Sequence, residues 1–187
     1  MSLNYSVTSL AQANEITGGL SYTSKMPCPS YSLPATACNV GRILATQPGS
    51  VCHKCYALKG RYRFGNVKDA LERRLEAIYH PQWVNAMVYL IVESDHLHFR
   101  WHDSGDIQSV AHLQRICKIA HRLPQVRFWL PTRETGILSA FYDTTSDVPP
   151  NLTIRVSATM VDGKPSQLWA HTSTVVSDSA LATCPAM

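Results

Sequence analysis

The chain has 187 residues, of which 45% are hydrophobic and 16% are charged. This composition allows one sizeable buried core and excludes a largely disordered or coiled-coil protein. The longest uninterrupted apolar run, residues 86–92, is far too short to cross a bilayer. No N-terminal stretch pairs basic residues with an apolar run as a secretory signal does. We therefore expect a soluble, cytoplasmic protein with no membrane partner.

The net charge of +4 is modest, but the positive charge is concentrated in one segment. Residues 54–74 contain seven basic and two acidic residues, a net charge of +5, so the rest of the chain carries −1. This basic segment directly follows a group of cysteines.

Residues 1–65 show little regular periodicity, because prolines and glycines interrupt them repeatedly. The interrupting residues are Pro27, Pro29, Pro34, Pro48, Gly18, Gly19, Gly41 and Gly49. A region this irregular needs something besides a hydrophobic core to order it, and a metal site would supply that.

Sequence patterns typical of helices and strands begin at residue 66. Asn66 is expected to cap a helix that continues to about residue 78, and Pro81 suits the first turn of a second helix ending near Glu93. Ser109 is expected to cap a third helix, with apolar residues on one face up to Leu123. A short helix is predicted over residues 136–142, and strands over residues 97–101, 126–130, 152–157 and 173–177.

Strands that alternate with helices indicate an α/β fold with a mostly parallel sheet covered by helices. The chain is shorter than the roughly 250 residues of a complete eight-stranded barrel. We therefore favour a partial (β/α) barrel-like arrangement over an open α/β sheet. We expect a single domain over residues 1–187, in which the cysteine-rich region 1–65 packs on the α/β body 66–187.

Four of the six cysteines, Cys28, Cys38, Cys52 and Cys55, lie in the irregular region and are separated by nine, thirteen and two residues. Four thiolates can hold a tetrahedral zinc ion or a [4Fe–4S] cluster, whereas magnesium and calcium prefer oxygen ligands. We predict one metal centre, either an iron–sulfur cluster or zinc, and the spacing does not choose between them. The alternatives are a redox-active CxxC pair and a set of unrelated buried thiols.

The two remaining cysteines are interpreted separately. Cys117 lies on the apolar face of its predicted helix, which favours a packed core thiol. Cys184 stands near the C-terminus between Thr183 and Pro185, and the sequence leaves open whether it is a further metal ligand or a tail residue.

Polar residues follow three successive predicted strands. His102, Asp103 and Asp106 come after the first strand, Arg133 after the second, and residues 157–159 after the third. α/β folds place ligand sites at such strand ends, so we expect a pocket with His102, Asp103, Asp106 and Arg133 as candidate catalytic residues. Alternatively, Asp106 and Ser109 cap the next helix, and Arg133 pairs with Asp103 or Glu134. No motif names a reaction.

Residues 56–64 interleave basic and aromatic side chains. Lys59, Arg61 and Arg63 could contact phosphates while Tyr62 stacks on a base, which predicts nucleic-acid binding. The alternative is that the aromatic rings shield the neighbouring metal site from solvent.

Several segments resemble the phage "gene product 88" family over about residues 27–185. They are CxxCYAxKGRYRF at residues 52–64, HxSGD at 102–106, FWxPTRE at 128–134 and VSATMVDG at 156–163. The resemblance implies a phage or prophage protein acting in the bacterial host cell, with a cysteine-ligated centre on a barrel-like body reminiscent of radical-SAM enzymes. However, the chain lacks CxxxCxxC, so radical chemistry on S-adenosylmethionine has no direct support.

We expect a C-terminally shortened member, because the family sequences continue past the segment at residues 183–186 into further cysteines. The leading hypothesis is a phage metalloprotein whose strand-end pocket acts on nucleic acid or a nucleotide. The rival is a non-enzymatic phage inhibitor that binds a host defence complex, with a purely structural metal.

Overall fold

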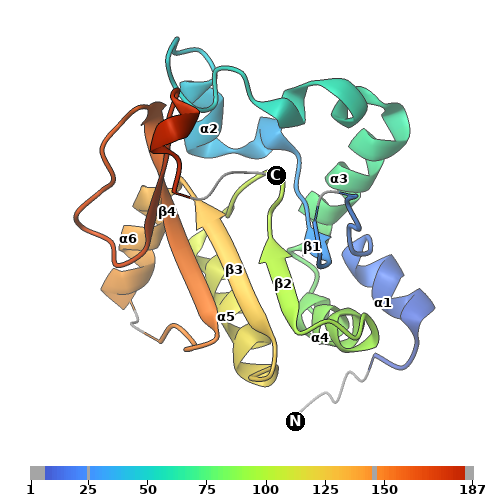
Figure 1. The fold of residues 1–187 in the computed structure, drawn as a ribbon. Helices are drawn as coiled ribbons and strands as arrows, with labels where there is room; N and C mark the ends of the chain where they lie inside the picture. The colour runs from blue at the N-terminus through green and yellow to red at the C-terminus, as the bar shows by residue number, and fades with distance from the viewer. Residues whose placement is uncertain (1–6, 25, 145–146, 184–187) are drawn as a thin grey trace.

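The computed structural model describes residues 7–24, 26–144 and 147–183. Its centre is a sheet of five strands in the order β1-β2-β3-β4-β5, and every neighbouring pair is parallel (Figure 1). The strands are β1 (Ser30–Tyr31), β2 (His98–Trp101), β3 (Arg127–Thr132), β4 (Leu152–Val161) and β5 (Thr172–Val175). The predicted α/β fold with a parallel sheet is confirmed, and the sheet is open rather than closed.

The four predicted helices of the second part of the chain are present: α3 (Gly65–Ala77), α4 (Trp83–Glu93), α5 (Val110–Arg122) and α6 (Thr135–Thr144). The side chain of Ser109 caps α5, as predicted, by accepting from the His112 N–H at 3.1 Å. Nowhere in the described ranges is a helix both long and apolar enough to cross a membrane.

Two predicted helix starts are wrong. α3 begins before Asn66, because the Phe64 carbonyl already accepts from the N–H groups of Val67 and Lys68 at 3.1 and 3.0 Å. Pro81 lies in the turn that precedes α4 rather than in its first helical turn, and the Trp83 N–H closes that turn on the His80 carbonyl at 3.0 Å.

The first 65 residues contain more regular structure than their composition predicts. Besides β1 they form α1 (Leu10–Thr17), α2 (Asn39–Leu44) and 3₁₀ turns at Ala35–Ala37, Tyr56–Leu58 and Gly60–Arg63. Ser9 caps the start of α1, and Gly18 ends it in the left-handed conformation with φ 75°. Ala13 of α1 packs against Ala86 and Leu90 of α4. Apolar packing thus orders part of this region without any metal.

One face of the sheet is covered by helices, and the other face is open. On β2 and β3, the alternate residues Phe99, Trp101, Phe128 and Leu130 are buried in one core with residues of α4, α5 and α6. Figure 1 shows α5 passing behind the middle strands. The intervening residues of the same strands point away from this core, so the helices cover one face and leave the other for a pocket.

The turn after β2 requires a glycine. Gly105 has φ 79°, and a Cβ atom there would lie 2.5 Å from the Leu33 Cβ and 2.7 Å from the Leu33 carbonyl oxygen. The main chain that leads into the cysteine-rich segment therefore lies directly against this turn. The contact continues through the Leu33 N–H, which donates to the Ser104 carbonyl at 2.8 Å.

We predict that Gly105→Ala lowers the free energy of unfolding by at least about 2 kcal/mol, from overpacking and an unfavourable φ. The matched control is Gly136→Ala in α6, where an added Cβ would meet nothing within 4 Å. That change should leave stability unchanged or raise it by up to about 1 kcal/mol. Urea unfolding measures both, and equal effects of the two changes would contradict the close approach.

Candidate functional site at the carboxyl edge of the sheet

Asp103 holds the N-terminal region against the end of β2. Its side chain is buried and accepts hydrogen bonds from Ser30 Oγ at 2.8 Å, from Ser32 Oγ, and from the Tyr62 hydroxyl at 3.1 Å. Its main-chain carbonyl accepts from the Tyr56 hydroxyl. One buried carboxylate thus connects β1 with the loop that carries the basic residues.

Asp106 makes the corresponding connection between β2 and β3. Its Oδ1 accepts from Thr132 Oγ1 at 2.7 Å and from the Ile107 N–H at 2.8 Å, and its Oδ2 accepts from the Arg133 N–H at 2.9 Å. Burial raises the pKa of this carboxyl to about 6, although the three donors oppose the shift. Asp106 joins strand ends rather than capping the following helix.

The side chains of residues 133 and 134 extend these connections. Arg133 Nε donates to the Ala158 carbonyl at 3.3 Å, which links the end of β3 to β4. Glu134 Oε1 accepts from the Val40 N–H at 2.9 Å, at the start of α2. Polar groups at the ends of β2 and β3 thus bond to one another and to the main chain. Residues 157–159, expected at a third strand end, lie within β4, which continues to Val161.

His102 is buried and lies in the left-handed region with φ 61°. Its Nδ1 lies 2.8 Å from the Tyr31 carbonyl, which assigns the ring proton to Nδ1, while Nε2 is buried without a partner among the described residues. Burial lowers the pKa of His102 to about 4. The buried ring of His112 lies 5.4 Å away between ring centroids, and burial and His102 lower its pKa as well.

Three of the four predicted metal ligands gather beyond the strand ends. A Cβ atom on Gly41 of α2 would lie 3.5 Å from Cys38 Sγ and 3.7 Å from Cys52 Sγ, so both sulfur atoms approach the same point. Cys55 acts electrostatically on both thiols. Burial raises the pKa of Cys38 to about 12, and burial also raises the pKa of Cys52 although the Arg133 charge opposes it.

Cys28 lies apart from the other three thiols. It precedes β1 whereas Cys38 follows it, so the strand carries the two thiols toward opposite edges of the sheet. Burial raises the pKa of Cys28, and the charge that acts on its thiol is Arg100. Cys117 is a core thiol, as predicted, with 5% of its surface exposed. Cys184 lies outside the described residues.

The metal centre stays a prediction. Within residues 7–24, 26–144 and 147–183, no group of three or more histidine, cysteine, aspartate or glutamate residues is spaced to hold a metal ion.

The predicted nucleic-acid residues divide into two kinds. Lys59, Arg61 and Arg63 are exposed. Tyr62 is not free to stack on a base with its whole ring, because its hydroxyl is committed to Asp103 and its ring meets Tyr56 edge-on at 5.8 Å. Nucleic-acid binding by this loop stays a prediction.

The sheet face opposite the helices carries a pocket of about 910 Å³ that the sequence reasoning missed. We call it the sheet-face pocket. It is lined by His98 and Arg100 of β2, Arg127 and Trp129 of β3, and Thr153 and Arg155 of β4. The signal was present, since these polar residues alternate with apolar ones, as they do in a strand with one open face.

These features define an α/β protein with an open parallel sheet, a polar and thiol-rich carboxyl edge, and a pocket on the uncovered face. The chain belongs to the gene product 88 family, whose family model matches residues 5–180. This confirms the resemblance of the sequence motifs to that phage family. The chain matches no curated protein and no solved structure.

We predict that Asp103→Ala lowers the free energy of unfolding by about 2–4 kcal/mol, because it leaves three hydroxyl donors without their charged acceptor. Tyr62→Phe should cost about 1 kcal/mol, and the double variant should cost less than the sum of the two. Asp69→Ala on the exposed surface of α3 is the control and should change stability by at most about 0.5 kcal/mol. Additive effects in the double variant would contradict the bond to Tyr62.

A second prediction concerns pH. His102 has a pKa of about 4 in the folded protein and about 6.5 when unfolded, so the unfolded chain binds more protons between these values. Stability should therefore fall as the pH drops from about 6.5 to about 4, by an amount on the order of 3 kcal/mol for this residue. Asn tolerates a positive φ, so His102→Asn removes the effect while keeping the turn.

The measurement is the difference in unfolding free energy between the original protein and His102→Asn, taken from pH 7 to pH 4. Taking a difference cancels groups that the two proteins share, such as Asp106. The histidine protein should lose its advantage over the variant as the pH falls. A difference that stays constant over this range would show that His102 is accessible to protons in the folded state.

Proposed function

We propose that the protein is a metalloprotein, in which the thiolates of Cys38, Cys52 and Cys55 hold a zinc ion or an iron–sulfur cluster at the carboxyl edge of the sheet. The observation that carries this proposal is the approach of two sulfur atoms to the side of α2 where Gly41 lacks a Cβ. Gly41 also avoids a contact of 2.9 Å with the Cys38 Cβ, so a larger residue would push Cys38 away.

The chemical type of these donors is compatible with zinc and iron, although the three thiols are not spaced to hold an ion in this structure. Cys52 and Cys55 flank a tight turn in which the Cys55 N–H donates to the Cys52 carbonyl at 3.1 Å, a spacing common in zinc and iron–sulfur sites. Soft thiolates favour zinc and iron over magnesium and calcium. A tetrahedral centre needs one donor more than the three thiols provide, and Cys28 would have to move across the end of β1 to supply it.

A metal bound here would cross-link two segments with little apolar core of their own. Cys38 directly precedes α2, and Glu134 fixes the first turn of that helix to the end of β3. Cys52 and Cys55 belong to the next turn, which is attached to β4 through the Val51 N–H and the Thr159 carbonyl at 2.9 Å. These contacts support a structural role for the metal.

The strand order also supports interpreting the sheet as part of a (β/α) barrel wall, in which functional groups gather at the carboxyl ends of the strands. The burial of His102, Asp103 and Asp106 favours a role in holding these strand ends together. Catalysis by these residues and Arg133, and the alternative of an inhibitor that binds a host defence complex, stay predictions.

Metal analysis and visible absorption of anaerobically purified protein test the proposal. We expect about one zinc ion per chain, or about four iron atoms with broad brown absorption that is lost on reduction. Cys38→Ser, Cys52→Ser and Cys55→Ser should each lose most of the metal. Cys28→Ser and Cys117→Ser are matched controls and should retain it.

Colourless protein without zinc or iron would overturn the proposal. Metal loss in all five variants, including Cys117→Ser, would also contradict it. If Cys28→Ser loses as much metal as Cys38→Ser, the centre uses four thiols and the position of Cys28 described above is not that of the metal-bound protein.

A further inference from the structure

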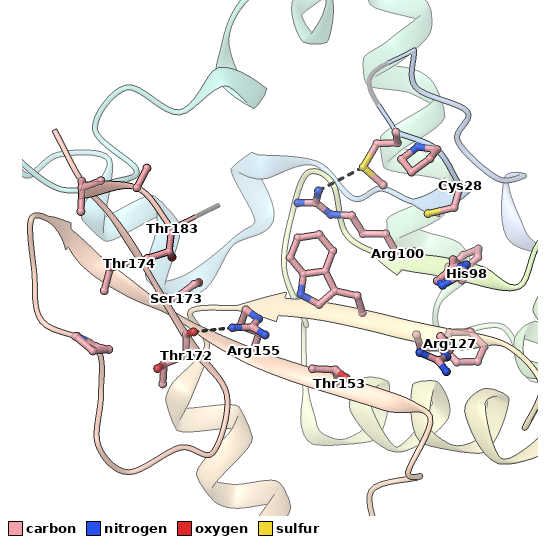
Figure 2. A pocket seen from close by; sticks show the side chains of 18 of the residues that line it. Cys28, His98, Arg100, Arg127, Thr153, Arg155, Thr172, Ser173, Thr174 and Thr183 are labelled. Carbon is pink, nitrogen blue, oxygen red and sulfur yellow. Dashed lines mark hydrogen bonds between the residues drawn. The ribbon is translucent and has the colours of Figure 1, made fainter. Parts of the chain in front are cut away.

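The open face of the sheet concentrates positive charge that no described carboxylate offsets. Arg100, Arg127 and Arg155 extend from three neighbouring strands into the sheet-face pocket, together with His98 (Figure 2). Among the residues that the structure describes, no aspartate or glutamate lines the pocket and none of these arginines forms an ion pair. Cations gathered on one concave surface attract anions.

Two of these guanidinium groups have donors to spare. Arg127 is exposed, and its guanidinium group makes no hydrogen bond within the described part of the chain. The Nε of Arg100 is buried without a partner there, and its Nη1 lies 3.3 Å from the weak acceptor Met26 Sδ. In contrast, Arg74 donates to two main-chain carbonyls at 2.8 and 3.2 Å. Buried donors without acceptors are rare, and an anionic ligand would supply the acceptors.

The dimensions favour a ligand with more than one anionic group. The volume of about 910 Å³ is that of a small-molecule site rather than of a site for a single ion. Arg100 on β2 and Arg155 on β4 are two strands apart, which corresponds to about 10 Å at the usual strand spacing. Cationic side chains spread over this span can each contact a different anionic group of one ligand.

An aromatic ring stands in the middle of the cationic surface. Trp129 is 41% exposed on the central strand, in register with Arg100 on one side and Thr153 on the other. The Arg100 guanidinium lies 4.6 Å from the centroid of the Trp129 ring. Indole and guanidinium planes both stack on nucleobases. On the far side, β5 adds the hydroxyl groups of Ser173 and Thr174 as donors.

We propose that the sheet-face pocket binds a nucleotide, with Arg100, Arg127 and Arg155 on its phosphates and Trp129 beside its base. A free nucleotide and a short single strand of nucleic acid offer the same chemistry, and the test distinguishes them. The proposal does not rest on the metal centre, because it uses no thiolate ligand of that centre.

The test uses the full chain and two fluorescently labelled probes, ATP and a 5′-phosphorylated oligothymidylate, with fluorescence anisotropy as the readout. We expect saturable binding of at least one probe, and Arg127→Gln should weaken it by at least about tenfold. Lys118→Gln on the exposed side of α5 removes the same charge elsewhere and should change affinity less than about twofold. Binding of ATP identifies a free nucleotide as sufficient, and binding of the oligonucleotide alone identifies a strand.

A second variant tests the aromatic contact. Trp129→Leu should lower the affinity for ATP more than the affinity for inorganic tripolyphosphate, measured by competition with the labelled probe. Tripolyphosphate has the negative charge of ATP but no base. Arg127 and Trp129 are both partly exposed, so thermal melting should show that these variants remain folded.

Three results would overturn the proposal. The first is no saturable binding of either probe at millimolar protein. The second is equal weakening by Arg127→Gln and Lys118→Gln, or loss of binding in Arg61→Gln alone, which would assign it to the basic loop. The third is that tripolyphosphate and ATP displace the labelled probe equally well, both from the original protein and from Trp129→Leu. The pocket would then be a general anion site that does not recognise a base.

Discussion

A parallel sheet brings the carboxyl ends of all its strands to one edge. Main-chain N–H and C=O groups beyond this edge no longer pair with a neighbouring strand, so they need other hydrogen-bond partners. In this protein the turn at residues 102–106 supplies those partners. Asp103 accepts from the hydroxyls of β1 and of the basic loop, and Asp106 accepts from the end of β3. His102 and Gly105 adopt left-handed conformations in this turn, and the carboxyl groups of Asp103 and Asp106 are buried beside it.

The cysteine-rich segment depends on this turn for its position. The chain passes Leu33 directly against Gly105, and Glu134, next to the Asp106 contacts, fixes α2. The hydrogen bonds of Asp106 and Glu134 along this edge therefore help to position the thiols near one another. This explains how Cys38 and Cys52, which are fourteen positions apart in an irregular segment, come together.

The sequence predicted the parallel α/β architecture and all four helices of the second part because apolar periodicity there is strong. It failed where local cues are weak. The two-residue strand β1 has no pattern of its own and exists through its pairing with Arg100 and Trp101 of β2. The helix α1 was overlooked, although Ser9 and Gly18 mark its ends.

The sequence predicted polar residues at the strand ends, but their burial could not be read from it. Whether a carboxylate such as Asp103 faces solvent or three hydroxyl donors depends on Ser30, Ser32 and Tyr62, which are distant in the chain. The grouping of thiols was likewise predicted from spacing alone, which cannot show that β1 separates Cys28 from Cys38.

Alternate residues of β2, β3 and β4 have different roles. Phe99, Phe128 and Ile154 belong to the core, whereas Arg100, Arg127 and Arg155 line the pocket on the open face. Exchange of the exposed Arg127 therefore carries a smaller folding penalty than exchange of the inward-facing set, which the helices constrain. Over evolutionary time such a sheet can acquire new binding specificities on its open face while the scaffold beneath it stays the same.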